Sequence, residues 1–253
     1  RYVNGVDYFA LDHDEGQFDG YLKRYGTFAG TGITSFRMPS NLQYIAPETF
    51  RNCEQLKTFY IGKAFRGKIN YGEEGDPDTL FLYYAPIRLI QIDKENTSYQ
   101  LQNEILYTRD GHILCQALKN DNADSQLTIP SCVTEIADGA FYRNSEFGAI
   151  EVKGSLERIG ISAFACADVG SFYVKGGVNY LDRGSFYQSA ISEWRCHGGV
   201  KKYEKSAFQD VDATNGYAID MNAITKLYQE LLYVNATTDL SYWVKTIWNW
   251  IIM

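Results

Sequence analysis

The sequence predicts a repeat solenoid, mainly β, in which short strands stack into a parallel sheet. Three observations predict it. A Phe recurs about every 22 residues, an apolar pattern typical of strands follows each Phe, and both periodicities stop near residue 220. One turn of this kind cannot bury both of its sides, so the turns are expected to stack on one another.

The Phe repeat is clearest between residues 132 and 208, where four ten-residue segments align without gaps. The Phe that ends each segment follows the previous one by 23, 22 and 22 residues. The segments are Cys132–Phe141, Ser155–Phe164, Gly177–Phe186 and Gly199–Phe208. An N-terminal copy runs from Asn41 to Phe50. Phe28 lies 22 residues before Phe50, and Phe81 is expected to mark the third turn.

A strand is expected five or six residues after each Phe, where the order apolar-x-x-apolar-x-apolar recurs. The last two apolar positions alternate with one outward position, as in a half-buried strand. The triplets are Ile33/Phe36/Met38, Leu56/Phe59/Ile61, Ile87/Ile90/Ile92, Phe147/Ile150/Val152, Val169/Phe172/Val174 and Ile191/Trp194/Cys196. Leu127/Ile129 and the weaker Ala213/Ala218 extend the series to eight candidate strands.

The most complete turn reads Thr-Ile-Pro-Ser-Cys-Val-Thr-Glu-Ile-Ala-Asp-Gly-Ala-Phe over residues 128–141, and the next most complete runs from Arg37 to Cys53. These turns resemble the BspA-like leucine-rich repeats, and the resemblance covers roughly residues 20 to 218. It implies a surface-displayed or secreted binding module, located outside the cell or at its surface. It also implies that Cys53 and Cys166 are buried thiols packed against the next turn.

Three regions are expected along the chain. Residues 1–27 form an N-terminal segment or cap, residues 28–220 the solenoid, and residues 221–253 a C-terminal helical cap, because apolar residues from Met221 to Leu232 fall on one helical face. Insertions at about 62–86 and 93–124 interrupt the repeat. The second is expected to hold a hairpin from Leu101 to Leu114 that turns at Asp110-Gly111. The apolar run Tyr242–Met253 is too short for a bilayer span and is expected to form part of this cap. A membrane-interface helix is the minority alternative, because its Trp residues suit an interface.

Composition and charge exclude several classes of partner. The chain has 253 residues, of which 45% are hydrophobic and 22% charged, enough apolar material for a core. A net charge of -7 does not suit phosphate backbones or anionic lipid, so neither nucleic acid nor membrane contact is expected. Because the chain opens at Arg1 without a signal-peptide pattern, it is expected to be a mature or trimmed product.

Chemistry-bearing residues do not form a recognisable catalytic or metal set, so no enzyme activity and no cofactor are predicted. Cys196 and His197 are neighbours on a strand and should point to opposite faces. His112 and Cys115 lack the second ligand pair that structural zinc needs. Acidic runs near Asp12 and at residues 73–78 could bind calcium, but solvated loops are expected. A metal or enzymatic site in the insertions is a minor alternative.

The outward residue of each strand is the best lead to function. These residues are expected to form one column roughly 35 Å long, given strands about 4.8 Å apart. They are Arg37, Tyr60, Gln91, Thr128, Glu151, Tyr173, Arg195 and Tyr217. Tyr and Arg are favoured in interface hot spots, although Tyr is also a good strand former. The predicted function is non-catalytic adhesion to a host or matrix protein or glycan through this strand face. A structural spacer that displays another domain is the alternative.

Overall fold

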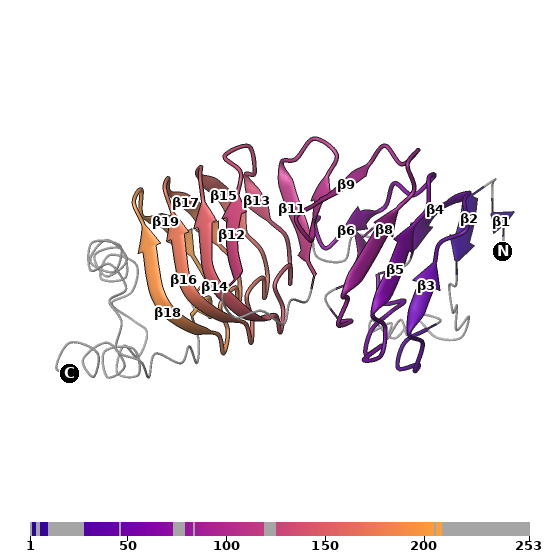
Figure 1. Ribbon diagram of the computed structural model, residues 1–253, viewed down its shortest axis with the longest axis horizontal. Coiled ribbons are helices and arrows are strands. Elements are labelled where there is room, and N and C mark those ends of the chain that lie inside the picture. The colour runs from indigo at the N-terminus through magenta and orange to yellow at the C-terminus, as the bar shows by residue number, and fades with distance from the viewer. Residues whose placement is uncertain are drawn as a thin grey trace, which may run out of the picture.

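The chain is a β-solenoid in the computed structural model, which describes residues 2–3, 6–9, 28–45, 47–72, 79–82, 84–118, 125–204 and 206–208. Within these residues every regular element is a strand, and seven successive turns stack along the long axis (Figure 1). The predicted repeat solenoid is therefore confirmed. The expected strand at Ala213/Ala218 and the expected helical cap lie outside the described residues.

The strands predicted from the apolar triplets lie along one long side of the solenoid, here called the column face. They form two parallel sheets rather than one. The first has the order β3 (Ser35–Arg37), β5 (Thr58–Ile61) and β8 (Leu89–Ile92). The second has the order β12 (Ser125–Ile129), β14 (Ser145–Val152), β16 (Asp168–Val174) and β18 (Ala190–Cys196).

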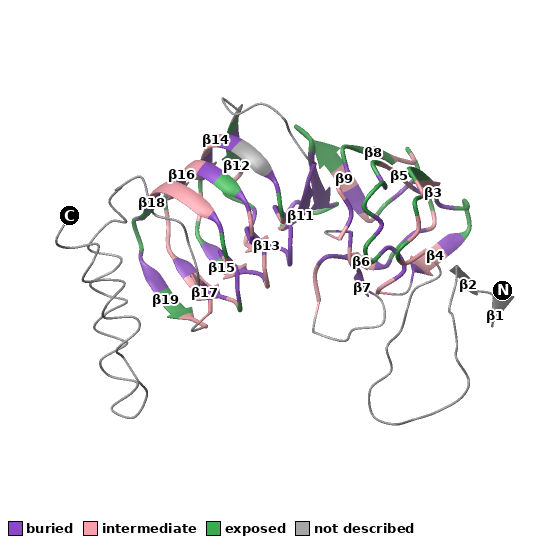
Figure 2. Cartoon of the chain, turned by 90° about the horizontal axis from the view of Figure 1, so that it is seen from below, coloured by how far each residue is buried: buried purple, intermediate pink, exposed green. Residues whose placement is uncertain are grey.

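The opposite side, here called the second face, has its own ladder (Figure 2). Its parallel strands are β11 (Ile113–Ala117), β13 (Glu135–Ile136), β15 (Leu156–Ile159), β17 (Val178–Leu181) and β19 (Val200–Tyr203). Turns meet so closely at the corner between the faces that a Cβ on Gly198 would lie 2.6 Å from the nitrogen of Gly177. Glycine is therefore required at this corner.

Shorter strands complete the N-terminal half. β1 (Tyr2–Val3) pairs antiparallel with β2 (Val6–Phe9), which pairs parallel with β4 (Leu42–Ile45) and so extends the sheet beyond the first turn. In the first insertion, β6 (Lys68–Ile69) pairs parallel with β7 (Thr79–Leu80).

The repeated Phe residues stack ring on ring through the core. Centroids lie 4.6 Å apart for Phe141 and Phe164, 5.0 Å for Phe164 and Phe186, and 5.2 Å for Phe186 and Phe208, with planes within 9° of parallel. Phe81, expected to mark the third turn, is only half-buried and contacts Tyr84. The adjacent Leu82 is fully buried in the core instead, so the predicted marker of this turn is wrong by one residue.

The second insertion is a three-stranded meander, not the single hairpin expected. β10 (Ile105–Thr108) and β11 do turn at Asp110-Gly111, where Gly111 has a φ of 76°. A further turn at Asn103-Glu104, with φ values of 50° and 61°, adds β9 (Tyr99–Gln102). Glu104 is not a residue type that announces a left-handed turn, so the sequence pattern does not indicate it. β11 is also no insertion, because it begins the regular ladder of the second face.

This meander is a wall between two apolar cores. All four residues of β10 are buried. Ile105 and Tyr107 belong to the C-terminal core, whereas Leu106 belongs to the N-terminal core. In β11, Leu114 and Cys115 divide between the two cores in the same way. The solenoid is therefore two blocks that share one wall.

Asn70 joins the blocks. Its side-chain nitrogen donates to the Cys115 carbonyl at 3.0 Å and to Oε1 of Gln116 at 2.6 Å, and its Oδ1 accepts from the Leu82 nitrogen at 2.7 Å. Its own carbonyl accepts from the Asp138 nitrogen at 2.7 Å. Fully buried and with a φ of 61°, Asn70 satisfies backbone groups from both sides of the wall.

Candidate ligand-binding face

The predicted outward residues are in register, but they form two columns. Arg37 pairs with Tyr60 and Tyr60 with Gln91, which we call the N-terminal column. The C-terminal column runs in register through Thr128, Glu151, Tyr173 and Arg195. All seven are exposed or half-buried. The expectation of one continuous column is wrong, because the meander interrupts the column face between β8 and β12. Tyr217 lies outside the described residues.

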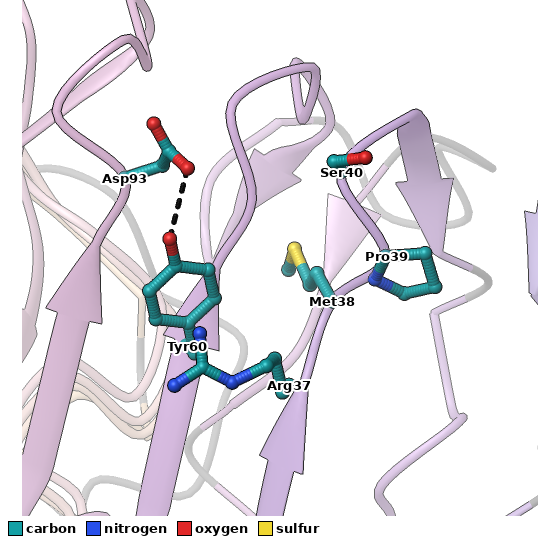
Figure 3. A pocket seen from close by; sticks show the side chains of 6 residues that line it. All are labelled: Arg37, Met38, Pro39, Ser40, Tyr60 and Asp93. Carbon is teal, nitrogen blue, oxygen red and sulfur yellow. Dashed lines mark hydrogen bonds between the residues drawn. The ribbon is translucent and has the colours of Figure 1, made fainter.

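Arg37 and Tyr60 are held together in the N-terminal column. The guanidinium carbon of Arg37 lies 3.9 Å from the centroid of the Tyr60 ring, a cation–π contact between neighbouring strands. The Tyr60 hydroxyl donates to Oδ2 of Asp93 at 2.9 Å (Figure 3). That hydrogen bond raises the pKa of Tyr60. Hydrogen bonds from the Glu95 nitrogen and then from Tyr60 lower the pKa of Asp93. Arg37, Tyr60 and Asp93 therefore form an ordered row of cation, phenol and carboxylate.

An open hollow of about 350 Å³ lies beside this row. It is lined by Arg37, Met38, Pro39, Ser40, Tyr60 and Asp93 (Figure 3). Four of these residues come from the end of β3 and the corner that follows it. The other two are Tyr60, near the end of β5, and Asp93, directly after β8. Asp93, Ser40 and Pro39 were not among the predicted site residues. They come after the strand pattern ends, so its periodicity could not single them out.

Charges in the C-terminal column are compensated on the protein itself. Glu151 lies 2.5 Å from Nζ of Lys153 and 3.6 Å from that of Lys175. The hydrogen bond with Lys153 lowers the pKa of Glu151. Arg195 pairs with Glu193, two residues earlier on the same strand. Much of the charge in this column is therefore neutralised by neighbouring side chains of the protein.

The second face carries a polar network that the sequence did not reveal. Arg158 contacts Glu135 at 2.8 Å, Asp138 at 2.5 Å and Asp182 at 2.9 Å. Burial raises the pKa of Asp138. Burial opposes charge on Arg158, but the carboxylates outweigh it and raise its pKa. Residues 135, 158 and 182 come from successive turns, so the network ties the stack together.

Tyr180 continues the polar surface of the second face. Its hydroxyl donates to Oε1 of Glu204 at 2.7 Å, and the Lys202 nitrogen lies 5.1 Å from its ring centroid. Burial, followed by the hydrogen bond to Glu204, raises the pKa of Tyr180 to about 12. The polar groups of this face pair with one another across neighbouring turns, so their role is to hold the stacked turns together.

The cysteines and histidines follow the predictions in part. Cys196, the last residue of β18, is buried, and His197, which follows it, is exposed, so the two side chains differ in burial as expected. Cys53 is buried, but its thiol donates to the Phe28 carbonyl at 2.8 Å, in the preceding turn rather than the next. Cys166 does contact the next turn, 3.8 Å from Oε1 of Gln188, yet it is half-buried and not the buried thiol expected.

Metal-binding and membrane-spanning features are absent from the described residues. Within them, no group of three or more His, Cys, Asp or Glu side chains is placed to hold a metal ion. The acidic runs near Asp12 and at 73–78 lie outside that part of the chain. The same part contains no helix long and apolar enough to cross a bilayer.

Comparison with known proteins identifies a repeat family that agrees with the architecture. Six copies of the BspA type leucine rich repeat region match residues 24–71 and 111–215. No curated protein matches the chain. The crystal structure of the pneumococcal vaccine antigen PcpA is 16% identical, with a TM-score of 0.47 over 70% of this chain. A leucine-rich repeat protein from Eubacterium ventriosum is 15% identical, with a TM-score of 0.42 over 73%. This chain spans 58% and 66% of those chains, respectively.

Proposed function

The chain belongs to the family of BspA type leucine-rich repeats, and we propose that it is a non-catalytic binding module that acts outside the cell or at its surface. It recognises a host or matrix protein or glycan through the column face. The observation that carries this proposal is the register of exposed Arg and half-buried Tyr side chains across adjacent strands. These are the residue types that dominate binding energy in many interfaces.

The two long sides of the solenoid differ in a way that favours the column face. On the second face, Arg158 and Tyr180 bind carboxylates of neighbouring turns. On the column face, Glu151 and Arg195 also pair with neighbouring side chains, but Arg37, Gln91 and Thr128 are exposed and make no ion pair within the described residues. Exposed polar side chains of this kind remain available to a ligand.

A panel of purified extracellular-matrix proteins and oligosaccharides tests the proposal. The three variants Tyr60→Ala, Tyr173→Ala and Arg195→Ala, and the triple variant, should fold normally, because all three side chains are exposed or half-buried. The triple variant should bind the ligand found on the panel about tenfold or more weakly. Tyr187→Ala, a half-buried Tyr in a Phe turn outside both columns, is the matched control. Unchanged affinity in the triple variant would show that the column face is the wrong one.

A further inference from the structure

We infer that the N-terminal column and the hollow beside it form a site for a sugar that bears a carboxylate, with the Arg37 guanidinium as the anion contact. This inference deepens the proposed function and rests on it, because it names the ligand class for one part of the column face. It is carried by three features: the charge of Arg37, which no described carboxylate neutralises, the ordering of Arg37 by Tyr60, and the polar groups of Asp93 and Ser40 in the hollow.

The charge of Arg37 is not neutralised within the part of the chain that the structure describes. Arg37 and Arg195 occupy equivalent strand positions in the two columns, but two residues earlier one strand has Ser35 and the other has Glu193. Glu193 pairs with Arg195. Among the described residues, Arg37 makes no ion pair, and its guanidinium contacts the Tyr60 ring. Its exposed guanidinium can therefore donate hydrogen bonds to an oxyanion. The paired N–H groups of arginine match the two oxygens of a carboxylate.

Arg37 is also ordered before any ligand arrives. Its guanidinium carbon lies 3.9 Å from the Tyr60 ring centroid, and that ring is itself fixed by its 2.9 Å hydrogen bond to Asp93. Ordering a flexible side chain on binding costs free energy, and a side chain that is already ordered avoids much of this cost. The row is therefore better prepared for binding than an isolated surface arginine.

The other polar residues of the hollow favour a ligand that carries hydrogen-bond donors beside its anionic group. Hydrogen bonds to Oδ1 and Oδ2 keep Asp93 ionised, since they lower its pKa. A ligand with carboxylates and no nearby donors would be repelled by Asp93. An acidic sugar carries hydroxyl donors next to its carboxylate, and the hydroxyl of Ser40 is a further partner on the hollow's rim. About 350 Å³ is at the small end of the roughly 300–1,000 Å³ of ligand pockets.

An extended peptide finds little to pair with at this position. The Met38 nitrogen already donates to the Tyr60 carbonyl at 3.1 Å, and the Gly62 nitrogen faces the Met38 sulfur at 3.5 Å. Pro39 has no N–H at all. These three backbone nitrogens therefore offer an added strand no hydrogen-bond donor. Side chains provide the contacts, which favours a compact polyhydroxylated ligand.

Matched probes with and without the carboxylate test the inference by titration calorimetry. They are sialyllactose and a glucuronate-containing tetrasaccharide, each compared with its own carboxyl-reduced form. At least one carboxylated probe should bind, and its uncharged partner should bind about tenfold or more weakly. Arg37→Gln and Asp93→Asn should each weaken binding by a similar factor. Arg66→Gln, at an exposed arginine outside both columns, should leave it unchanged.

The outcomes separate this inference from the proposed function. If neither carboxylated probe binds better than its partner, or if Arg37→Gln binds as well as the wild type, the inference is overturned. The proposed function still stands in that case if a neutral glycan, a matrix protein or an acidic peptide loses affinity with Tyr60→Ala or Tyr173→Ala. If every ligand found is insensitive to all column variants, both fail.

Discussion

Nη2 of Arg158 lies 2.5 Å from Oδ1 of Asp138, the least exposed of the three carboxylates around this guanidinium. Asp138 also accepts from the Ile161 nitrogen at 2.8 Å. Arg158 thus stands between carboxylates contributed by the turns before and after its own. Those carboxylates belong to turns that are two strand spacings, or roughly 10 Å, apart, and the cation shared between them offsets their repulsion.

Arg158→Gln should lower the free energy of unfolding by about 2–3 kcal/mol, because it leaves Asp138 buried without its cation. Urea unfolding measures this. Arg66→Gln, an exposed arginine, is the control and should change stability by less than about 0.5 kcal/mol. A similarly small change for Arg158→Gln would mean that the network does not stabilise the stack.

Stability should depend on pH with opposite signs at two aspartates. Burial raises the pKa of Asp138 in the folded state. Its contribution to stability is therefore fully present below the unfolded pKa and is lost as pH rises through the folded pKa. The pKa of Asp93 is lowered by its hydrogen bonds, so its contribution is present above the unfolded pKa and is lost as pH falls through the folded pKa.

Urea unfolding from about pH 3 to 7 tests these signs. The difference in free energy of unfolding between wild type and Asp138→Asn should move in favour of the wild type as the pH falls. The difference between wild type and Asp93→Asn should move the other way. Slopes of the same sign for both pairs would contradict the assigned causes.

Asn70→Ala should uncouple the two blocks. The variant removes the side-chain hydrogen bonds to the Leu82 nitrogen in the N-terminal block and to Cys115 and Gln116 in the wall, at a cost of about 2–4 kcal/mol. Hydrogen exchange at increasing urea should then show β5 and β16 opening separately. Asn52→Ala is matched in backbone conformation, with φ of 56° against 61°, but Asn52 is exposed. If Asn70→Ala changes stability and hydrogen exchange no more than this control, other residues couple the two blocks.

The Phe stack should be costly to interrupt at its middle. Phe164 is fully buried, and its ring lies between those of Phe141 and Phe186. Phe164→Ala should lower the free energy of unfolding by about 3–5 kcal/mol. Phe81→Ala removes the same side chain from a half-buried position and should cost clearly less. Equal losses by urea unfolding would argue against stacking as the source of stability.

The repeat is readable from the sequence because it depends on spacing. Phe164 and Phe172 recur at fixed distances, and a stacked turn must place such residues inward. The register of Arg37 with Tyr60, and of Tyr173 with Arg195, follows from the same period. The strand columns are therefore predictable from the period of the repeat alone.

The interruption is not readable from the sequence, because it depends on contacts between distant segments. Asn70 meets Gln116 and Asp138 across 46 and 68 positions of sequence, and no local pattern marks such a residue. The turn at Asn103-Glu104 has no glycine to announce it. For the same reason, Asp93 could not be predicted as the hydrogen-bond partner of Tyr60, which lies 33 residues away in sequence.

Hydroxyl-radical footprinting with bound ligand tests the central claim most directly, because tyrosines lie on both faces. Tyr60 and Tyr173 are on the column face, and Tyr180, equally half-buried, is on the second face. With a ligand from the panel, oxidation of Tyr60, Tyr173 or both should fall, while oxidation of Tyr180 should stay unchanged. Protection of Tyr180 without protection of either column tyrosine would contradict the account.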